Sequence, residues 1–243
     1  MQVIKLNATD STNTYLKKLG QTVYLNDYTV VVATAQLKGK GQLGAVWQSE
    51  PGKNLTFSLL KKFDNLTVND CFLVNVCISL AISNCLKECS VPDVSIKWPN
   101  DILSGTTKIC GILIENLIQS DQIKSSIIGV GLNVNQVSFT TLANASSLKL
   151  LLGRTFDLDE LQTRLLYFAK NYFSMFENSA FDQLRNEYQA ALFRKDKPST
   201  FMDQNGKRFM GFIRGVSVHG KLLVELEGAI TQEFDLKQLR LLY

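Results

Sequence analysis

The amino-acid sequence predicts an α+β protein in which a sheet with flanking helices is followed by a small all-β barrel. Residues 28–35 and 109–114 are β-branched or apolar runs of strand length, whereas 159–175 has helical periodicity. Near Phe193 the composition changes to a charged, proline-containing link, and turn-separated strands follow at a spacing of roughly ten residues. A chain of 243 residues has room for one large domain with a small appendix. We therefore expect one domain at 1–193 and a second at 194–243.

The first half of the chain alternates strands with helices. Asp10 and the three residues after it offer N-cap side chains to a short helix that Gly20 is expected to end. The stretch 69–89 is apolar on all sides, which predicts a helix buried against the sheet. Three strands are expected in addition, at 2–6, 28–35 and 55–60.

The second half continues this order and ends in strands alone. Pro99 lacks an N–H and ends the extended segment 94–96, and 104–107 is a turn cluster. Gly129 and Gly131 lie inside an expected strand, which indicates that another group approaches the backbone closely there. The further expected elements are strands at 109–114, 126–134, 209–218, 221–226 and 230–234, and helices at 159–175 and 181–192.

Composition excludes several classes of function. The net charge of +4 is mild and is not gathered in a basic block, which argues against nucleic acid as the main partner. His219 is the sole histidine, so multi-histidine zinc sites are excluded and a histidine-based triad is disfavoured. Five cysteines without a C-x-x-C pair indicate reduced thiols and a cytoplasmic location. No apolar run approaches the ~18 residues of a membrane span, so no membrane is expected.

The stretch that organises the chain is Lys-Trp-Pro-Asn-Asp at 97–101, followed by Lys108 and by Gly-Ile-Leu-Ile-Glu at 111–115. It places two lysines, a carboxamide and a carboxylate at the ends of short buried strands. Such polar groups form a site, or else the lysines are simply solvated at strand ends.

A long glycine-rich segment joins the strands 28–35 and 55–60, and loops of this length in a compact domain are usually functional. Its glycines allow the backbone to approach a phosphate, while Lys38 and Lys40 supply charge. The spacing matches neither a Walker loop nor a Rossmann turn. Trp47 stacks on a flat base or anchors the segment to the core. At the first helix, the side chains of Ser11, Thr12 and Asn13 either cap the helix or line a polar pocket.

In this order and spacing, these motifs resemble the biotin–protein ligases: Ser-Thr-Asn at 11–13, Gln36 with the glycine loop and Trp47, the 97–101 motif with Lys108, Gly-Ile-Leu-x-Glu at 111–115, and Gly-x-Gly-x-Asn ending at Asn133. The resemblance covers the whole chain. It implies a mixed sheet with flanking helices, like that of class II aminoacyl-tRNA synthetases, and a C-terminal SH3-like barrel. The first motif begins about ten residues from Met1, so we expect a monofunctional ligase without a DNA-binding helix-turn-helix domain.

The resemblance also implies roles for individual residues. Lys108 would be the principal catalytic lysine, bridging the biotin carboxyl and the α-phosphate of ATP, and Asp101 a base, a Mg²⁺ ligand, or both. The remaining implied biotin contacts are Ser11, Thr12, Asn13, Gln36, Lys40, Gly41, Gln42 and Gly111, and the implied nucleotide contacts are Gln42, Trp47, Asn100, Lys108 and Asn133. Lys40 is also expected to act in catalysis. The implied acceptor is a biotin carboxyl carrier protein of a biotin-dependent carboxylase or decarboxylase, and the enzyme is expected to be a monomer or a homodimer.

The glycine loop departs from the family pattern. Many members read G-R-G-R-x-G-R there, whereas 39–45 is Gly-Lys-Gly-Gln-Leu-Gly-Ala, which keeps one charge and no bidentate arginine fork. We therefore expect looser retention of the adenylate than in arginine-rich members. Three other functions compete: a lipoate or octanoate ligase or transferase of the same fold, a non-catalytic biotin sensor, and an RNA- or peptide-binding module built on the barrel. The lipoate and octanoate enzymes share an R-R-x-S-G-G-G-A type segment, which this chain lacks. A biotin sensor would need neither Lys108 nor Asp101, so the presence of both argues against it.

Overall fold

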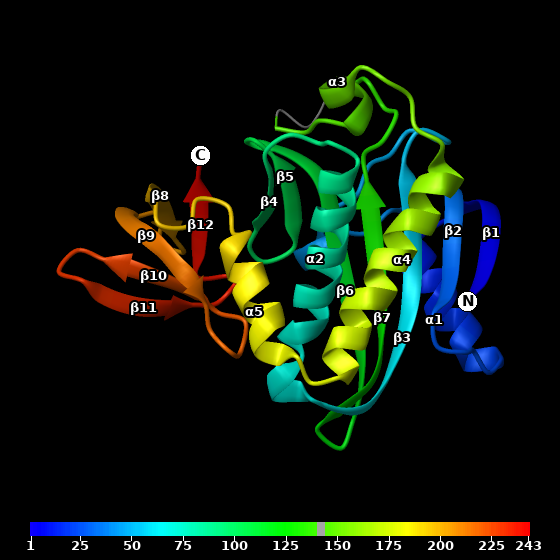
Figure 1. The fold of residues 1–243 in the computed structure, drawn as a ribbon, viewed down its shortest axis with the longest axis horizontal. Helices are drawn as coiled ribbons and strands as arrows, with labels where there is room; N and C mark the ends of the chain where they lie inside the picture. The colour runs from blue at the N-terminus through cyan, green and yellow to red at the C-terminus, as the bar shows by residue number, and fades with distance from the viewer. Residues whose placement is uncertain (140–143) are drawn as a thin grey trace.

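The computed structural model describes residues 1–139 and 144–243, in which two β-sheets and five α-helices are arranged as Figure 1 shows. The helices are α1 (Thr12–Thr22), α2 (Phe72–Glu88), α3 (Leu148–Leu152), α4 (Leu158–Glu177) and α5 (Phe181–Ala190). The strands of the first sheet are β1 (Gln2–Thr9), β2 (Thr29–Gln36), β3 (Leu55–Thr67), β4 (Val94–Lys97), β5 (Asp101–Ser104), β6 (Thr107–Gln119) and β7 (Gln122–Leu132). Those of the second are β8 (Pro198–Asp203), β9 (Arg208–Val216), β10 (Leu222–Leu226), β11 (Ile230–Phe234) and β12 (Leu239–Leu242).

The first sheet is mixed, and its strand order is β1-β2-β3-β7-β6-β5-β4. The pair β1 and β2 is parallel, and every other neighbouring pair is antiparallel. Helices α2 and α4 cover one face, whereas α1 packs against β2, β3 and β7 on the other (Figure 1). The predicted α+β fold with a mixed sheet is therefore confirmed.

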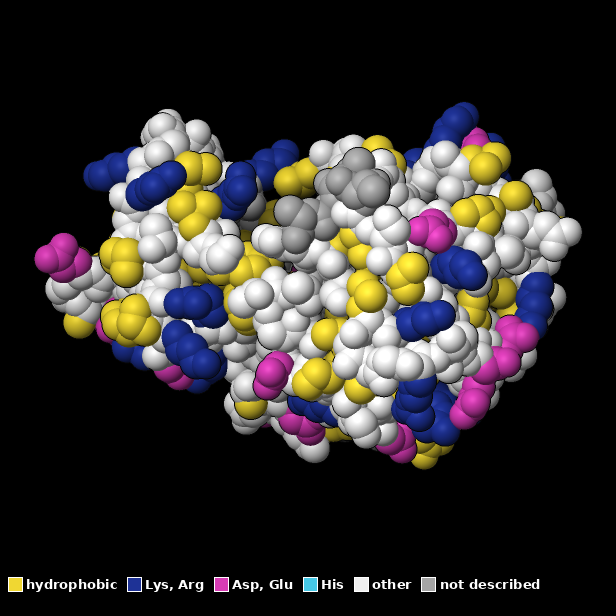
Figure 2. All heavy atoms as spheres, turned by 90° about the horizontal axis from the view of Figure 1, so that it is seen from above, with side chains coloured by type: hydrophobic (Ala, Val, Ile, Leu, Met, Phe, Trp, Pro, Cys, Tyr) yellow, Lys and Arg dark blue, Asp and Glu magenta, His cyan; other side chains and the backbone are white. Residues whose placement is uncertain are grey.

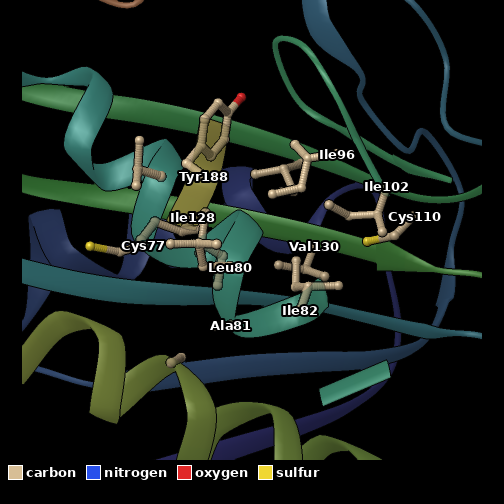
Figure 3. Close-up of a cluster of buried hydrophobic side chains, with 14 of the residues drawn as sticks. Cys77, Leu80, Ala81, Ile82, Ile96, Ile102, Cys110, Ile128, Val130 and Tyr188 are labelled. Atoms are coloured by element: carbon tan, nitrogen blue, oxygen red, sulfur yellow. The ribbon is translucent and has the colours of Figure 1, made fainter. Parts of the chain in front are cut away.

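The hydrophobic core lies between the sheet and α2, as Figure 3 shows. Leu80 and Ile82 of α2 pack with Ile128 and Val130 of β7, and the cluster extends to Tyr188 of α5. The segment Val68–Glu88 has the length and hydropathy of a membrane span, contrary to the expectation that no apolar run would. Because 67% of its most apolar window is buried inside the fold, it has the character of a core helix.

The second sheet is antiparallel, with the order β12-β8-β9-β10-β11. Strands β9, β10 and β11 agree with the sequence prediction. Strands β8 and β12 were not expected, because β8 starts at Pro198 in the charged link and β12 has only four residues. Two more corrections concern the first sheet and its helices. Helix α1 runs through Gly20 to Thr22, and β3 and β6 are each 13 residues long, so both extend well beyond the predicted apolar runs.

Candidate active site

A cavity of about 220 Å³ opens on the α1 face of the mixed sheet, beneath the long segment between β2 and β3. Residues from six parts of the chain meet there: the start of α1, the glycine-rich loop, strand β3, the loop before β5, the first half of β6 and the last part of β7. Twelve of the residues singled out in the sequence line it, namely Ser11, Thr12, Asn13, Gln36, Lys40, Gly41, Gln42, Trp47, Asn100, Asp101, Lys108 and Gly111. The segments are up to 120 residues apart in sequence, so the sheet topology is what assembles the site.

The charged centre of the cavity is an ion pair between Lys108 and Asp101. The Lys108 Nζ lies 2.6 Å from the Asp101 carboxylate and 5.7 Å from the centroid of the Trp47 ring. Both partners are partly shielded, since the side chain of Asp101 is 18% exposed and that of Lys108 35%. An ion pair of this kind, with an aromatic face beside it, holds the ammonium in a defined position.

A β-bulge directs Lys108 into the cavity. Leu103 of β5 pairs with Lys108 but Ile102 pairs with Cys110, so Ile109 is an extra residue in β6. In a regular strand, side chains two residues apart share a face, and Lys108 would follow Cys110 into the buried core. The extra residue reverses that alternation, and Lys108 lines the same cavity as Gly111.

The residues at the start of α1 both cap the helix and line the cavity, which the sequence had left as alternatives. Ser11 is the N-cap, and its hydroxyl accepts a hydrogen bond from the Thr14 N–H. The Thr12 N–H donates to Oε1 of Gln36 at 2.8 Å, which fixes the orientation of the Gln36 amide. The Asn13 Nδ2 donates to the Glu115 carboxylate at 2.8 Å and to the Leu113 carbonyl at 3.3 Å. All three residues of the motif are buried and line the cavity.

The glycine-rich loop folds back on itself. The Gly41 N–H donates to the Ala45 carbonyl at 2.7 Å and the Trp47 N–H to the Gly39 carbonyl at 2.9 Å, so the tip is a short hairpin. Trp47 then turns its indole onto the sheet, where a Cβ at Gly131 would overlap the ring and one at Gly111 would lie 3.0 Å from it. The group that approaches Gly131 is therefore this indole, and the group that approaches Gly129 is the Asn13 side chain. Among the described residues, the buried Trp47 Nε1 has no hydrogen-bond partner.

One expected nucleotide contact lies elsewhere. Asn133 does not line the cavity, and its carboxamide donates to the Ser146 carbonyl at 3.0 Å. Asn100 does line it, although its Nδ2 donates to the Ile112 carbonyl at 2.7 Å, which ties the loop before β5 to β6. Its neighbour Asp101 also borders a second cavity of about 300 Å³ that reaches Lys97 and Arg240 beside the second sheet.

Sequence reasoning missed Ser58 and gave no role to Glu115. Ser58 is fully buried on β3, and its hydroxyl lies 2.7 Å from the Thr12 hydroxyl and 2.5 Å from Oδ1 of Asn13. The available signal was a hydroxyl inside an otherwise apolar part of β3, since a buried polar group needs a partner.

Residues 6–133 match the biotin/lipoate A/B protein ligase family, and the chain belongs to that family. It is 36% identical over 108 residues to the bifunctional ligase/repressor BirA of Bacillus subtilis, a match that spans 44% of this chain but only 33% of that protein. It is 26% identical over 205 residues to the biotin–[acetyl-CoA-carboxylase] ligase of Mycobacterium tuberculosis, covering 83% of this chain and 75% of that one.

Among solved structures, the fold is similar to that of a biotin protein ligase from Aquifex aeolicus in complex with biotin and ATP. The TM-score is 0.81 at 26% sequence identity, and the alignment covers 99% of this chain and 98% of that one. The resemblance stated from the sequence motifs is thereby confirmed.

Proposed function

We propose that this protein is an ATP-dependent biotin–protein ligase, which activates biotin as biotinyl-5′-AMP and transfers it to a lysine of a biotin carboxyl carrier protein. The observation that carries the proposal is the Lys108–Asp101 pair, which lies in one cavity with the buried polar side chains at the start of α1. Family membership and the similarity to a ligase that binds biotin and ATP support the same conclusion.

The first step joins two anions. The biotin carboxylate is ionised at neutral pH and attacks the α-phosphorus of ATP, with pyrophosphate as the leaving group. Electrostatic repulsion is the obstacle, and a fixed ammonium in a partly dehydrated cavity lowers that barrier. Lys108 would bridge the carboxylate and the α-phosphate. To do so, its three N–H groups must be divided between Asp101 and the two substrates.

The donor set suits Mg²⁺ carried by ATP rather than a dedicated metal site. Among the described residues no cluster of three or more His, Cys, Asp or Glu side chains occurs, and Asp101 is the carboxylate that lines the cavity. Mg²⁺ typically binds one or two carboxylates together with substrate phosphates and waters. Asp101 would hold the ion, whose charge would offset that of the triphosphate.

The second step is attack on the adenylate by the amine of an acceptor lysine. That amine has a reference pKa of ~10.4 and must lose a proton, for which Asp101 is the candidate base. The glycine-rich loop would contact the adenylate through Lys40, Gly41 and Gln42 and keep water away from it. Ser11, Thr12, Asn13 and Gln36 would hold the bicyclic end of biotin, Gly111 would give that ring room beside β6, and Trp47 and Asn100 would contact the nucleotide.

The acceptor and the domain division belong to the same proposal. A relative named as a biotin–[acetyl-CoA-carboxylase] ligase supports the carrier domain of a biotin-dependent carboxylase as the partner. We place the catalytic domain at 1–193 and the second domain at 194–243, because the last helix ends at Ala190 and the second sheet begins at Pro198.

The decisive experiment incubates the purified protein with ATP, Mg²⁺ and either biotin, lipoate or octanoate, and detects the acyl-adenylate by mass spectrometry. We expect biotinyl-AMP only. Lys108→Ala should abolish it without lowering the melting temperature, whereas Lys170→Ala, which removes an exposed lysine of α4, should leave it unchanged. Adenylate formed from lipoate or octanoate in preference to biotin would overturn the substrate, and an active Lys108→Ala variant would overturn the role of the ammonium.

A further inference from the structure

A buried hydrogen-bond chain lies directly behind the polar end of the cavity. It links Thr12 and Asn13 of α1, Ser58 of β3 and Glu115 of β6, and none of the four residues sits on the flexible part of the site. Ser58 is 0% exposed, Asn13 2% and Thr12 3%, so each polar atom must find its partner within the protein or on a ligand.

The direction of each hydrogen bond follows from counting protons. A carboxylate is only an acceptor, so Glu115 faces the Nδ2 of Asn13 and the Asn13 Oδ1 points toward Ser58. That oxygen carries no proton, and the Ser58 hydroxyl at 2.5 Å must therefore donate to it. Since a hydroxyl has a single proton, Ser58 then accepts from the Thr12 hydroxyl at 2.7 Å, and the Thr12 proton is shared with Oε1 of Gln36, which lies 3.1 Å from Thr12 Oγ1.

The Asn13 amide packs directly on the backbone of β7 at Gly129. A Cβ at Gly129 would overlap the Asn13 carboxamide, so β7 is shaped around this side chain. The second Nδ2 proton is taken by the Leu113 carbonyl at 3.3 Å. Both protons of the Asn13 amide thus donate to groups of the protein. The atoms that can still accept a hydrogen bond from a ligand are Asn13 Oδ1 and Thr12 Oγ1.

We propose that Ser58 and Glu115 are positioning residues that fix Thr12 and Asn13 as hydrogen-bond acceptors toward the cavity, so that this end of the site selects a ligand group with N–H donors. The inference rests on the proposed function, in which that group is the ureido ring of biotin. Neither Ser58 nor Glu115 lines the cavity itself. Their effect therefore falls on the affinity for biotin and not on the chemical step.

The first test compares Ser58→Ala with Ser83→Ala, using biotin titrated calorimetrically and the KM for biotin in adenylate formation. Ser83 is a matched control, because it is also fully buried and its hydroxyl has no partner among the described residues. Ser58→Ala leaves Asn13 Oδ1 without its donor, and we expect the Kd and KM for biotin to rise about tenfold or more while kcat changes much less. Ser83→Ala should change neither constant.

The second test reverses the polarity of one hydrogen bond. Asn13→Asp places two carboxylates in contact and should weaken biotin binding far more than tenfold, whereas adding Glu115→Gln supplies a donor and should restore at least tenfold of the loss. A merely structural role predicts that the melting temperature and kcat fall and recover together with the biotin affinity.

Two results would overturn the inference: biotin binding by Ser58→Ala within twofold of the wild type, or no recovery in the double variant. Failure of the proposed function is distinguishable, because the wild-type protein would then form no biotinyl-AMP at all.

Discussion

At the scale of single residues, the site depends on contacts between side chains that sequence motifs treat as separate. Lys108 has Asp101 at 2.6 Å and the Trp47 ring at 5.7 Å, and that ring in turn packs on Gly131. Neighbours in one network show non-additive effects, so the losses caused by substituting Lys108 and Asp101 should not sum. Removing either residue leaves the charge of the other without its partner. The double variant therefore measures the coupling between the two side chains.

Residue burial makes a prediction about thiol chemistry. Burial raises the pKa of Cys77 and of Cys110 far above the ordinary value, and it raises that of the half-buried Cys71 as well. A thiol reacts as its thiolate, so the fully buried Cys77 and Cys110 stay protonated and unreactive at pH 8. We expect iodoacetamide to modify the half-buried Cys71 and to leave Cys77 and Cys110 unmodified in the native protein, as peptide mass spectrometry would show.

The pH dependence of this reaction has a definite sign. Raising the pH increases the thiolate fraction, so labelling of Cys71 should accelerate between pH 7 and 9, whereas Cys77 and Cys110 should become reactive only after unfolding in urea. Fast labelling of Cys110 in the native state would contradict its burial beside Lys108.

The sequence predicted which residues meet in the cavity, but not how they are held. Motif spacing was sufficient to bring Lys108, Asp101 and the Ser-Thr-Asn motif together as lining residues of one cavity. Ser58 lies outside these motifs, and its hydroxyl acquires its role only from partners on α1. Asn133 shows the reverse case, because its motif suggested a ligand contact and its carboxamide instead holds the chain at Ser146.

At the scale of elements, irregularities in the strands decide which side chains face the cavity. The apolar run predicted β6, but the bulge at Ile109 that turns Lys108 toward the cavity has no signature in a single sequence. Helix α1 illustrates a similar limit. Its cap was predicted among residues 10–13 and is Ser11, whereas its end was placed at Gly20, because a glycine near the last periodic residue usually terminates a helix.

Because α1 continues past Gly20, this glycine costs stability. It is exposed on the helix, and a Cβ there would lie 3.5 Å from Leu25 Cδ1, which is ordinary contact. Alanine has the better helix propensity, and Gly20→Ala should raise the free energy of unfolding by about 0.5–1 kcal/mol. Urea denaturation would measure the change, and biotin activation should be unaffected because Gly20 lies two turns from Asn13. A lower midpoint would mean that α1 does not continue through this position.

At the scale of the whole molecule, the two sheets share one hydrophobic core. Phe201, Val224 and Leu239 of the second sheet belong to the same buried cluster as Leu80 and Ile128 of the first. The indole of Trp98, inside the 97–101 motif, also donates to the Gly220 carbonyl at 2.8 Å. On the face that Figure 2 shows, positive and negative side chains are interspersed over both parts. Apolar packing and this hydrogen bond therefore hold the second sheet against the 97–101 motif.

Gly220 is the position where this packing can be tested. Its φ is +84°, and a Cβ there would lie 2.5 Å from the Phe72 ring at the start of α2. Gly220→Ala therefore adds a steric clash to backbone strain. Gly228→Ala is the matched control, since its φ is +80° and a Cβ there would meet nothing within 4 Å.

We expect Gly228→Ala to lower the free energy of unfolding by about 1–2 kcal/mol, the cost of a left-handed alanine. Gly220→Ala should cost about 1–3 kcal/mol more, because the overpacked contact forces Phe72 or the turn to shift. The shift also moves the acceptor of the Trp98 indole, so adenylate formation should fall in Gly220→Ala and not in Gly228→Ala. Urea denaturation and the biotinyl-AMP assay measure the two effects. Equal stability and activity in the two variants would show that the second sheet does not support the 97–101 motif.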